Sequence, residues 1–292
     1  MLIGREEMKS LLLVDVSNTV IRNLSVNKYL EHEGEWTGGF YGTIGELVNF
    51  ISRNVQPTGT VFCCDSKPYL RDADYPNYKG DRKKKEYDEE DAPEGWDFYN
   101  ALADGYRQLK EFCEIGNYAH WSIPGYEADD LVALCVNYYC ETYDKIYILS
   151  NDSDLNQCLV HDNVAIWKKI GKGKKLYDKE TFKAQFDIEP EEWAFYTAMV
   201  GTHNGVPGIR GIGHKTAPKI IHSTQKVEEV INKHREALIQ KLDLIELPYF
   251  KIDAEKVQYP DPEIGKHNFR KIMVYLEQKG IDVTTRYREA FE

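Results

Sequence analysis

The sequence predicts an α/β protein built around a parallel β-sheet. Short apolar runs rich in Leu, Val and Ile have the length of buried strands, and polar or turn residues bound them. We expect strands at about 11–16, 59–65, 117–122 and 145–150. We expect helices between them at about 41–54, 94–115 and 126–142. Because alternating strands and helices are typical of βαβ units, the predicted sheet carries helices on both faces.

The rest of the chain is predicted to form a long loop, a hairpin and a helical region. Residues 67–93 are polar, rich in proline and charge, and lack apolar periodicity. Loops of this length in compact domains are usually functional or disordered. A β-hairpin is expected over VAIWKKIGKGKKLYD, with a Gly-Lys-Gly turn, and the pattern is helical from about 178 to 242. We therefore divide the chain into an α/β part, 1–177, and a helical part, 178–292.

The composition is that of a globular protein of the cytoplasm. Hydrophobic residues make up 42% of the chain and charged residues 29%. No run of 18 apolar residues exists, and the N-terminal MLIGREEMKS lacks the apolar core of a signal peptide. The six cysteines show neither CxxC nor zinc-ligand spacing, so we expect reduced thiols and no membrane association.

Seven carboxylates fall in four short clusters, and three of these clusters follow predicted strands. The acidic residues are Asp15, Asp65, Glu127, Asp129, Asp130, Asp152 and Asp154. The carboxyl ends of parallel strands share one crevice, where ligands bind. Carboxylates that converge there repel one another unless cations lie between them. Divalent ions with oxygen ligands, above all Mg²⁺, fit this set, and the pattern favours metal-assisted phosphodiester chemistry.

The spacing of the acids within two clusters supports convergence. Glu127 and Asp130 are three residues apart at the start of a predicted helix and share one helix face. Asp152 and Asp154 are two apart after a strand, so their side chains point the same way on an extended backbone. For any single residue, turn formation or compensation of the helix dipole explains an acid equally well. The full ordered set favours a metal site.

The net charge of −11 is unusual for a protein that binds nucleic acid, because Lys and Arg normally supply the affinity for phosphate. Part of this charge belongs to the predicted metal site. Basic residues are also clustered, at 82–85 and at 168–175. For nucleic-acid binding, the distribution of these basic residues matters more than the net charge of the chain. We expect binding that depends strongly on salt and on metal ions.

The order D…D…ExDD…DxD, followed by GIRGIGHKTA at 208–217, resembles the 5′-nuclease (flap endonuclease) family over about residues 10–250. The resemblance is closest to the stand-alone phage 5′-exonucleases, including the ribonuclease H-type enzymes that remove replication primers. It implies a PIN-like sheet, a helical arch at about 67–93 and a helix–two-turn–helix motif at about 204–223.

The resemblance also implies two divalent ions, Mg²⁺ or Mn²⁺. The first five acids then form the first site, and Asp152 and Asp154 lie between the sites or at the second. The chain departs from the family where the second site is normally completed by GDxSDNIPG. Here residues 201–208 read GTHNGVPG and carry no carboxylate, with Thr202 at the position of the first Asp. His203 and Asn204 remain as weak ligands, so we expect a second ion that binds weakly or only with DNA phosphate.

Several residues match family positions that contact DNA. The resemblance places Gly208, Gly211, Gly213 and Lys215 in the helix–two-turn–helix loop, which binds one DNA strand and a K⁺ ion. Lys79 and Arg82 match the arch residues that act on the scissile phosphate, and we assign them a catalytic role. Tyr78 is expected to stack on an unpaired base, and Arg22 to contact phosphate.

The resulting expectation is a monomeric, metal-dependent 5′→3′ exonuclease and structure-specific 5′-flap endonuclease. It would act on branched or 5′-ended DNA and on RNA–DNA hybrids, in primer removal within a phage-infected bacterial cell. A single-strand binding protein and a sliding clamp are the partners that the family suggests. Two alternatives stay open: a DNA-junction binding protein that has lost turnover, and a PIN-type ribonuclease. The second of these does not explain the arch-like stretch or GIRGIGHKTA.

Overall fold

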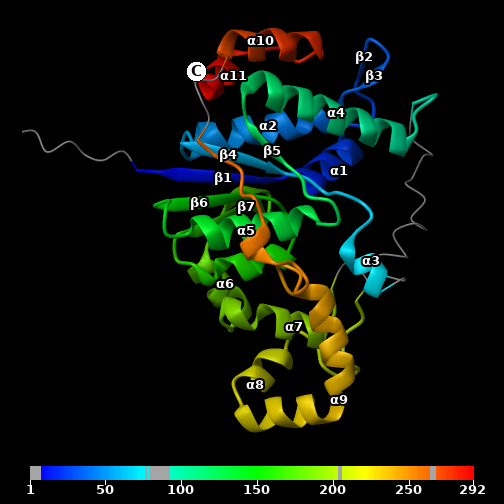
Figure 1. The fold of residues 1–292 in the computed structure, drawn as a ribbon, viewed down its shortest axis with the longest axis vertical. Helices are drawn as coiled ribbons and strands as arrows, with labels where there is room; N and C mark the ends of the chain where they lie inside the picture. The colour runs from blue at the N-terminus through cyan, green and yellow to red at the C-terminus, as the bar shows by residue number, and fades with distance from the viewer. Residues whose placement is uncertain (1–7, 76–77, 79–92, 203–205, 264–267) are drawn as a thin grey trace, which may run out of the picture.

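The computed structural model describes residues 8–75, 78, 93–202, 206–263 and 268–292. A six-stranded sheet in the order β5-β4-β1-β6-β7-β8 lies at its centre (Figure 1). The strands are β1 (Ser10–Asp15), β4 (Gly59–Cys63), β5 (Ala119–Trp121), β6 (Lys145–Leu149), β7 (Val164–Ile170) and β8 (Gly173–Tyr177). Neighbouring strands are parallel except β8, which runs antiparallel to β7. The predicted α/β class, its mainly parallel sheet and the hairpin are confirmed.

Side chains of β1 alternate between two hydrophobic cores, one on each face of the sheet. Leu11 and Leu13 pack into the core that contains α5 to α9. Leu12 and Val14 pack into the core that contains α1, α2 and α4. All four are buried, because successive side chains of a strand point to opposite faces and both faces are covered. This double burial explains why the strand is continuously apolar.

One face is covered by α1 (Val16–Val26), α2 (Gly38–Arg53), α4 (Phe98–Gly116), α10 (Phe269–Gln278) and α11 (Thr285–Phe291). The other is covered by α5 (Ala128–Tyr139), η2 (Asp154–Val160), α6 (Lys179–Phe186), η3 (Pro190–Glu192) and α7 (Trp193–Val200). Farther from the sheet lie α8 (Ala217–Ile221) and α9 (Thr224–Ile245). The remaining elements are short: β2 (Glu31–His32), β3 (Glu35–Trp36), α3 (Leu70–Asp74) and η4 (Ala254–Lys256).

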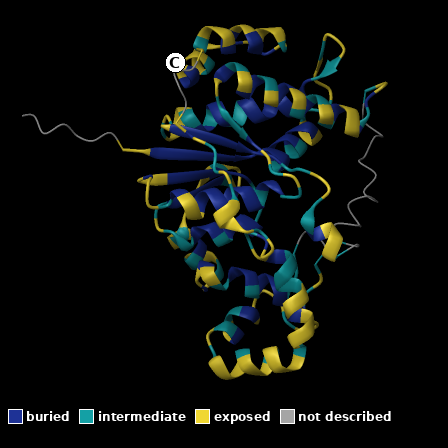
Figure 2. Ribbon diagram, in the orientation of Figure 1, coloured by how far each residue is buried: buried dark blue, intermediate teal, exposed yellow. Residues whose placement is uncertain are grey.

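Burial divides the molecule into a dense centre and an open end (Figure 2). The sheet is buried on both faces, whereas only Leu238 and Ile245 are buried in the 22 residues of α9. The last two helices, α10 and α11, lie on the face of the sheet that α1, α2 and α4 cover, and they pack beside α2 and α4. The division of the chain at residue 178 remains a prediction, and residues 269–291 share the core of the α/β part.

Helices α1 and α3 were not expected from the sequence. Helix α1 starts directly after β1 because Asp15 caps it by accepting a hydrogen bond from the backbone of Asn18. Helix α3 is a single short turn within the stretch that we read as a loop. Among the described residues, no helix is both long and apolar enough to cross a bilayer.

Candidate active site

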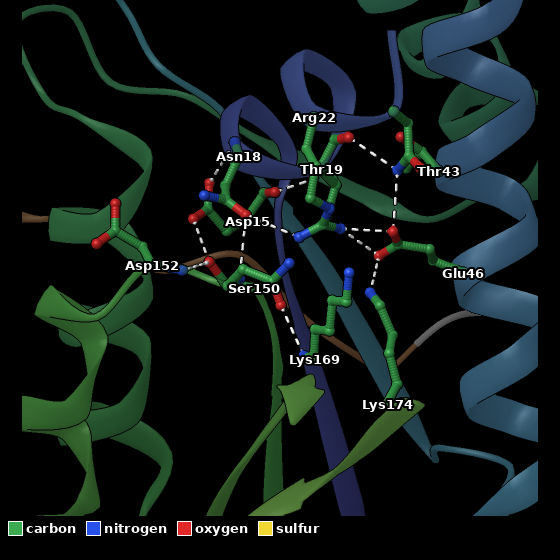
Figure 3. Close-up of polar contacts among 12 residues, drawn as sticks. Asp15, Asn18, Thr19, Arg22, Thr43, Glu46, Ser150, Asp152, Lys169 and Lys174 are labelled. Atoms are coloured by element: carbon green, nitrogen blue, oxygen red, sulfur yellow. Dashed lines mark hydrogen bonds and ion pairs between the residues drawn. The ribbon is translucent and has the colours of Figure 1, made fainter. Parts of the chain in front are cut away.

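The register of the sheet brings Asp15 and the end of β6 together. Val14 pairs with Leu149, so the next residues, Asp15 and Ser150, are neighbours. The Ser150 hydroxyl donates to Asp15 Oδ2 at 2.7 Å and accepts from the backbone N–H of Asp152 at 3.0 Å (Figure 3). One hydroxyl thus connects two of the predicted metal ligands.

Asp15 is held in a poorly hydrated position. The residue is 3% exposed, and burial is the main cause that raises the pKa of its carboxyl to about 8. The nearby charge of Asp152 raises it further, while the hydrogen bonds from Asn18 and Ser150 oppose the shift. A bound cation would favour the ionised form of this carboxyl.

Asp65 joins the loop after β4 to the start of α5. Its Oδ1 accepts from the backbone N–H of Ala128 at 2.7 Å, and its Oδ2 accepts from the Tyr69 hydroxyl at 2.8 Å. Because Ala128 is the first residue of α5, these bonds bring Asp65 to the end of α5 that carries the ExDD cluster.

The ExDD cluster forms the first turn of α5, where carboxylates are stabilised by the helix dipole. Ligand atoms of Glu127, Asp129 and Asp130 lie within 4.8 Å of one another, close enough to hold one metal ion. Glu127 and Asp130 are 2% and 1% exposed. The predicted convergence of these three residues is seen directly.

Arg71, which the sequence did not single out, lies against this cluster. Its Nη1 donates to Asp130 Oδ2 at 2.6 Å and to Glu127 Oε2 at 3.0 Å, and its Nη2 donates to Asp130 Oδ1 at 2.9 Å. Arg71 is itself only 2% exposed. No pattern in the polar segment 67–93 distinguishes this arginine from the other basic residues there.

Asp152 and Asp154 follow β6, and Lys168 of the basic cluster 168–175 lies nearby. The backbone N–H of Asp154 donates to Asp152 Oδ1 at 3.0 Å. The extended backbone that we expected between these two acids is wrong, because Ser153 has helical φ and ψ angles and Asp154 begins η2. On β7, Lys168 donates to Asn156 Oδ1 at 2.9 Å, and its ammonium lies 3.5 Å from the ring centroid of Tyr177. Burial lowers the pKa of Lys168 to about 8, and the charge of Asp152 partly offsets this effect.

Arg22 contacts the carboxylate of Glu46 and the side-chain amide of Asn18, as Figure 3 shows. Its Nη2 contacts both oxygens of Glu46, at 2.6 and 2.5 Å, and its Nη1 donates to Asn18 Oδ1 at 3.1 Å. Lys174 of β8 reaches the same Glu46 carboxylate. The contact between Arg22 and phosphate remains a prediction, and the structure adds Lys174 as a neighbouring cation.

The glycine-rich motif lies between α7 and α8. A Cβ at Gly208 would lie 2.3 Å from the carbonyl oxygen of Val200, so only glycine fits against the end of α7. Gly211 has φ +90°, which also favours glycine. Helix α8 begins at Ala217, and Lys215 is exposed. The nucleic-acid contacts of this loop remain predictions.

Four predicted site residues, Lys79, Arg82, His203 and Asn204, lie outside the described residues, as does most of the expected arch. Tyr78 is described, and its hydroxyl donates to Glu127 Oε2 at 3.1 Å. This contact places Tyr78 at the acidic cluster. Its stacking on a base remains a prediction.

The donor set fits divalent metal ions on chemical grounds. Asp15, Asp65 and Asp152 follow the neighbouring strands β1, β4 and β6, and Asp65 contacts the start of α5 through Ala128. Among the described residues, the ligand atoms that lie within 4.8 Å of one another are those of Glu127, Asp129 and Asp130. Hard oxygen ligands of this kind suit Mg²⁺ and Mn²⁺. The residues that would hold such ions come from segments more than 130 positions apart, and the parallel register brings them together.

Comparisons with known proteins agree with this geometry. Residues 10–187 match the family model described as the 5′-3′ exonuclease, N-terminal resolvase-like domain. A 5′-3′ exonuclease of Aquifex aeolicus is 28% identical and aligns over 97% of this chain and 98% of its own length. DNA polymerase I of Borreliella burgdorferi is 30% identical over 93% of this chain, which spans only 30% of that relative.

Solved structures share the fold. Phage T5 5′-exonuclease with divalent zinc ions bound has a TM-score of 0.64 at 22% identity, covering 93% of this chain and all of that chain. A flap endonuclease from Methanococcus jannaschii has a TM-score of 0.60 at 14% identity, covering 97% of this chain and 91% of that chain. The expected PIN-like architecture is confirmed by these likenesses.

Proposed function

The chain belongs to the 5′-3′ exonuclease family, whose members are nucleases that cleave phosphodiester bonds, and we propose that it is a divalent-metal-dependent 5′→3′ exonuclease and 5′-flap endonuclease. The observation that carries the proposal is the convergence of buried and half-buried carboxylates from separate strand ends on one edge of the sheet. The substrates we propose are branched or 5′-ended DNA and RNA–DNA hybrids, with primer removal as the cellular role.

We propose that Mg²⁺ or Mn²⁺ is held by the predicted ligands Asp15, Asp65, Glu127, Asp129, Asp130, Asp152 and Asp154. When bound, such ions lower the pKa of a water and neutralise charge on the scissile phosphate. The protein groups position these carboxylates: Ser150 bridges Asp15 and the backbone of Asp152, and Tyr69 orients Asp65. The second ion is expected to bind weakly, because residues 201–208 bring no carboxylate.

We also propose which residues contact the nucleic acid. Lys79 and Arg82 are proposed to contact the scissile phosphate, and Arg22 a neighbouring phosphate. Gly208, Gly211, Gly213 and Lys215 are proposed to bind the duplex, with K⁺, through the loop between α7 and α8. A solved T5 flap endonuclease complex contains DNA and metal ions, which supports the assignment by analogy.

The first experiment is cleavage of a 5′-labelled flap substrate over Mg²⁺ and Mn²⁺ titrations, with Asp152→Asn as the control. Wild type should cut near the junction, and the variant should lose about three orders of magnitude in rate or more, because it lacks a charged ligand. Near-wild-type cleavage by Asp152→Asn would exclude the proposed metal mechanism.

The alternative is a DNA-junction binding protein on the same scaffold. The segment GTHNGVPG favours it, because this segment lacks the two aspartates of the family motif. Tight binding of the flap substrate without cleavage, at every Mg²⁺ and Mn²⁺ concentration, would support this alternative over the nuclease.

A further inference from the structure

Arg71 makes a buried, two-pronged ion pair with Asp130. Both guanidinium nitrogens Nη1 and Nη2 bind the two Asp130 oxygens, at 2.6 and 2.9 Å, and Nη1 also reaches Glu127 at 3.0 Å. Paired hydrogen bonds of this kind fix the relative orientation of both groups. Arg71 and the hydroxyl of Tyr78 both donate to the same oxygen of Glu127, Oε2.

The opposite side of Arg71 is fixed by the segment that follows α9. Nη2 donates to the carbonyl oxygen of Glu246 at 3.2 Å, and the guanidinium lies 4.7 Å from the ring centroid of Tyr249. The backbone N–H of Tyr249 donates in turn to Asp130 Oδ1 at 2.8 Å. Asp130, Arg71 and Tyr249 thus contact one another in a closed triangle.

Helix α3 makes further contacts with the same segment. The Tyr75 hydroxyl donates to Asp243 Oδ2 at 2.8 Å. Asp74 accepts from the Tyr249 hydroxyl and pairs with Lys251. Arg71 lies within α3, so this helix is attached both to the start of α5 and to the end of α9.

We propose that Arg71 is a positioning residue, which orients Glu127 toward the metal and uses Asp130 as its anchor. On this inference Asp130 is no longer one of the proposed ligands: it supports the site instead of binding the ion, because both of its oxygens already accept a hydrogen bond from Arg71 and a second one from a backbone N–H, that of Tyr249 or that of Glu127. The inference rests on the proposed metal-dependent function. It also explains how α3 and the end of α9 are connected to the active site.

Electrostatics and positioning predict opposite effects when Arg71 is removed. Arg71→Gln deletes a positive charge beside two carboxylates, so a purely electrostatic role predicts tighter binding of a cation. A positioning role predicts weaker binding, because Glu127 loses its orientation. Loss of such an outer contact typically weakens metal binding by about 10- to 100-fold.

The test is calorimetric titration of Mn²⁺ into the full chain without nucleic acid. We expect Arg71→Gln to bind Mn²⁺ about tenfold weaker than wild type or worse. Arg71→Lys keeps the positive charge but cannot make two parallel hydrogen bonds to Asp130, so it should also bind Mn²⁺ more weakly. If Arg71→Gln does not fold, Arg71→Lys provides the test. Arg107→Gln is the matched control, because Arg107 is a partly exposed arginine on α4 that pairs with Asp104 and Glu111.

Amide hydrogen exchange adds a readout that does not depend on metal. In Arg71→Gln, residues 70–75 and 246–251 should exchange faster, with β1 and β6 unchanged. Tighter or unchanged Mn²⁺ binding in Arg71→Gln, or wild-type binding in Arg71→Lys, would overturn the proposal. Because neither measurement uses a substrate, a wild-type protein that fails to cleave would count against the nuclease function alone.

Discussion

At the residue scale, the carboxylates of the site differ in how many hydrogen bonds they accept from the protein. Asp130 accepts hydrogen bonds from a guanidinium and two backbone groups. Asp15 accepts from one backbone N–H and one hydroxyl while buried to the same degree. A buried carboxylate that lacks a cationic partner is costly to ionise. Asp15 is therefore the residue whose charge should depend most on a bound metal ion.

Asp15→Asn should change how stability depends on pH. The pKa of Asp15 is raised from 3.8 to about 8, so its proton stabilises the folded state at low pH, and this contribution is lost as the pH rises through about 4 to 8. At pH 8 with EDTA, Asp15→Asn should be about 1–3 kcal/mol more stable than wild type, and at pH 4 the difference should vanish. Urea unfolding at both pH values measures this. The same difference at both pH values would contradict it.

At the element scale, the glycine-rich loop is fixed to α7 by close backbone contact. Ile209 donates its N–H to the carbonyl of Met199 at 2.6 Å, and Gly208 lies against Val200. This contact sets the direction in which the chain leaves α7 toward α8. It requires glycine at position 208 for steric reasons, whatever the loop binds.

Gly208→Ala should destabilise the protein, because its Cβ would lie 2.3 Å from the backbone oxygen of Val200. We expect a loss of about 1–3 kcal/mol in the free energy of unfolding. Gly213→Ala is the matched control, since a Cβ there meets no atom within 4 Å. Thermal unfolding of both variants decides the matter, and equal melting temperatures would refute the steric argument.

The ion pairs that join α1, α2 and β8 lead to a second prediction at the scale of the elements. Glu46 neutralises both Arg22 and Lys174, each of which is mostly buried with it. Glu46→Gln should free these cations for phosphate and raise the affinity for duplex DNA about two- to tenfold at low salt, with a steeper salt dependence. Fluorescence anisotropy measures this, with the exposed Glu289→Gln as the charge control. Equal affinity of the two variants would show that Arg22 and Lys174 do not contact DNA.

At the scale of the whole molecule, a chain of net charge −11 has to bind a polyanion. Seven of its 48 acidic residues are the predicted metal ligands, whereas α9 exposes most of its length at the far end of the molecule (Figure 2). Divalent ions at the acidic edge would remove repulsion where the phosphates approach. Binding should therefore respond in opposite directions to divalent and monovalent salt.

This response can be measured with the Lys79→Ala protein, in which cleavage should be suppressed while every proposed metal ligand is kept. Addition of Mg²⁺ at fixed ionic strength should strengthen binding of a flap substrate, whereas added KCl should weaken it with a linear log–log slope. Filter binding or anisotropy gives both curves. Binding that Mg²⁺ weakens as KCl does would show that the acidic edge does not face the DNA.

The sequence by itself determined the fold class and the identity of the acidic cluster. Apolar runs that are buried on both faces leave a clear signal, and acids that follow such runs have to meet at one edge of a parallel sheet. The capping of α1 by Asp15 is also a local feature that the sequence encodes, although we did not expect a helix directly after Asp15. The sequence alone likewise predicted the glycine-rich turn before α8, because steric demands at single positions are local.

Only the tertiary structure decided which groups lie around those acids. Arg71, Ser150 and Glu46 carry no periodic or motif signal, and each has a partner that is distant in the chain: Arg71 contacts Glu127 and Glu246, Ser150 contacts Asp15, and Glu46 contacts Arg22. The packing of α10 and α11 beside α2 and α4 was also decided by the tertiary structure, because these contacts join residues that are distant in the chain. Charge compensation inside a protein is set by three-dimensional proximity, and a linear pattern does not encode it.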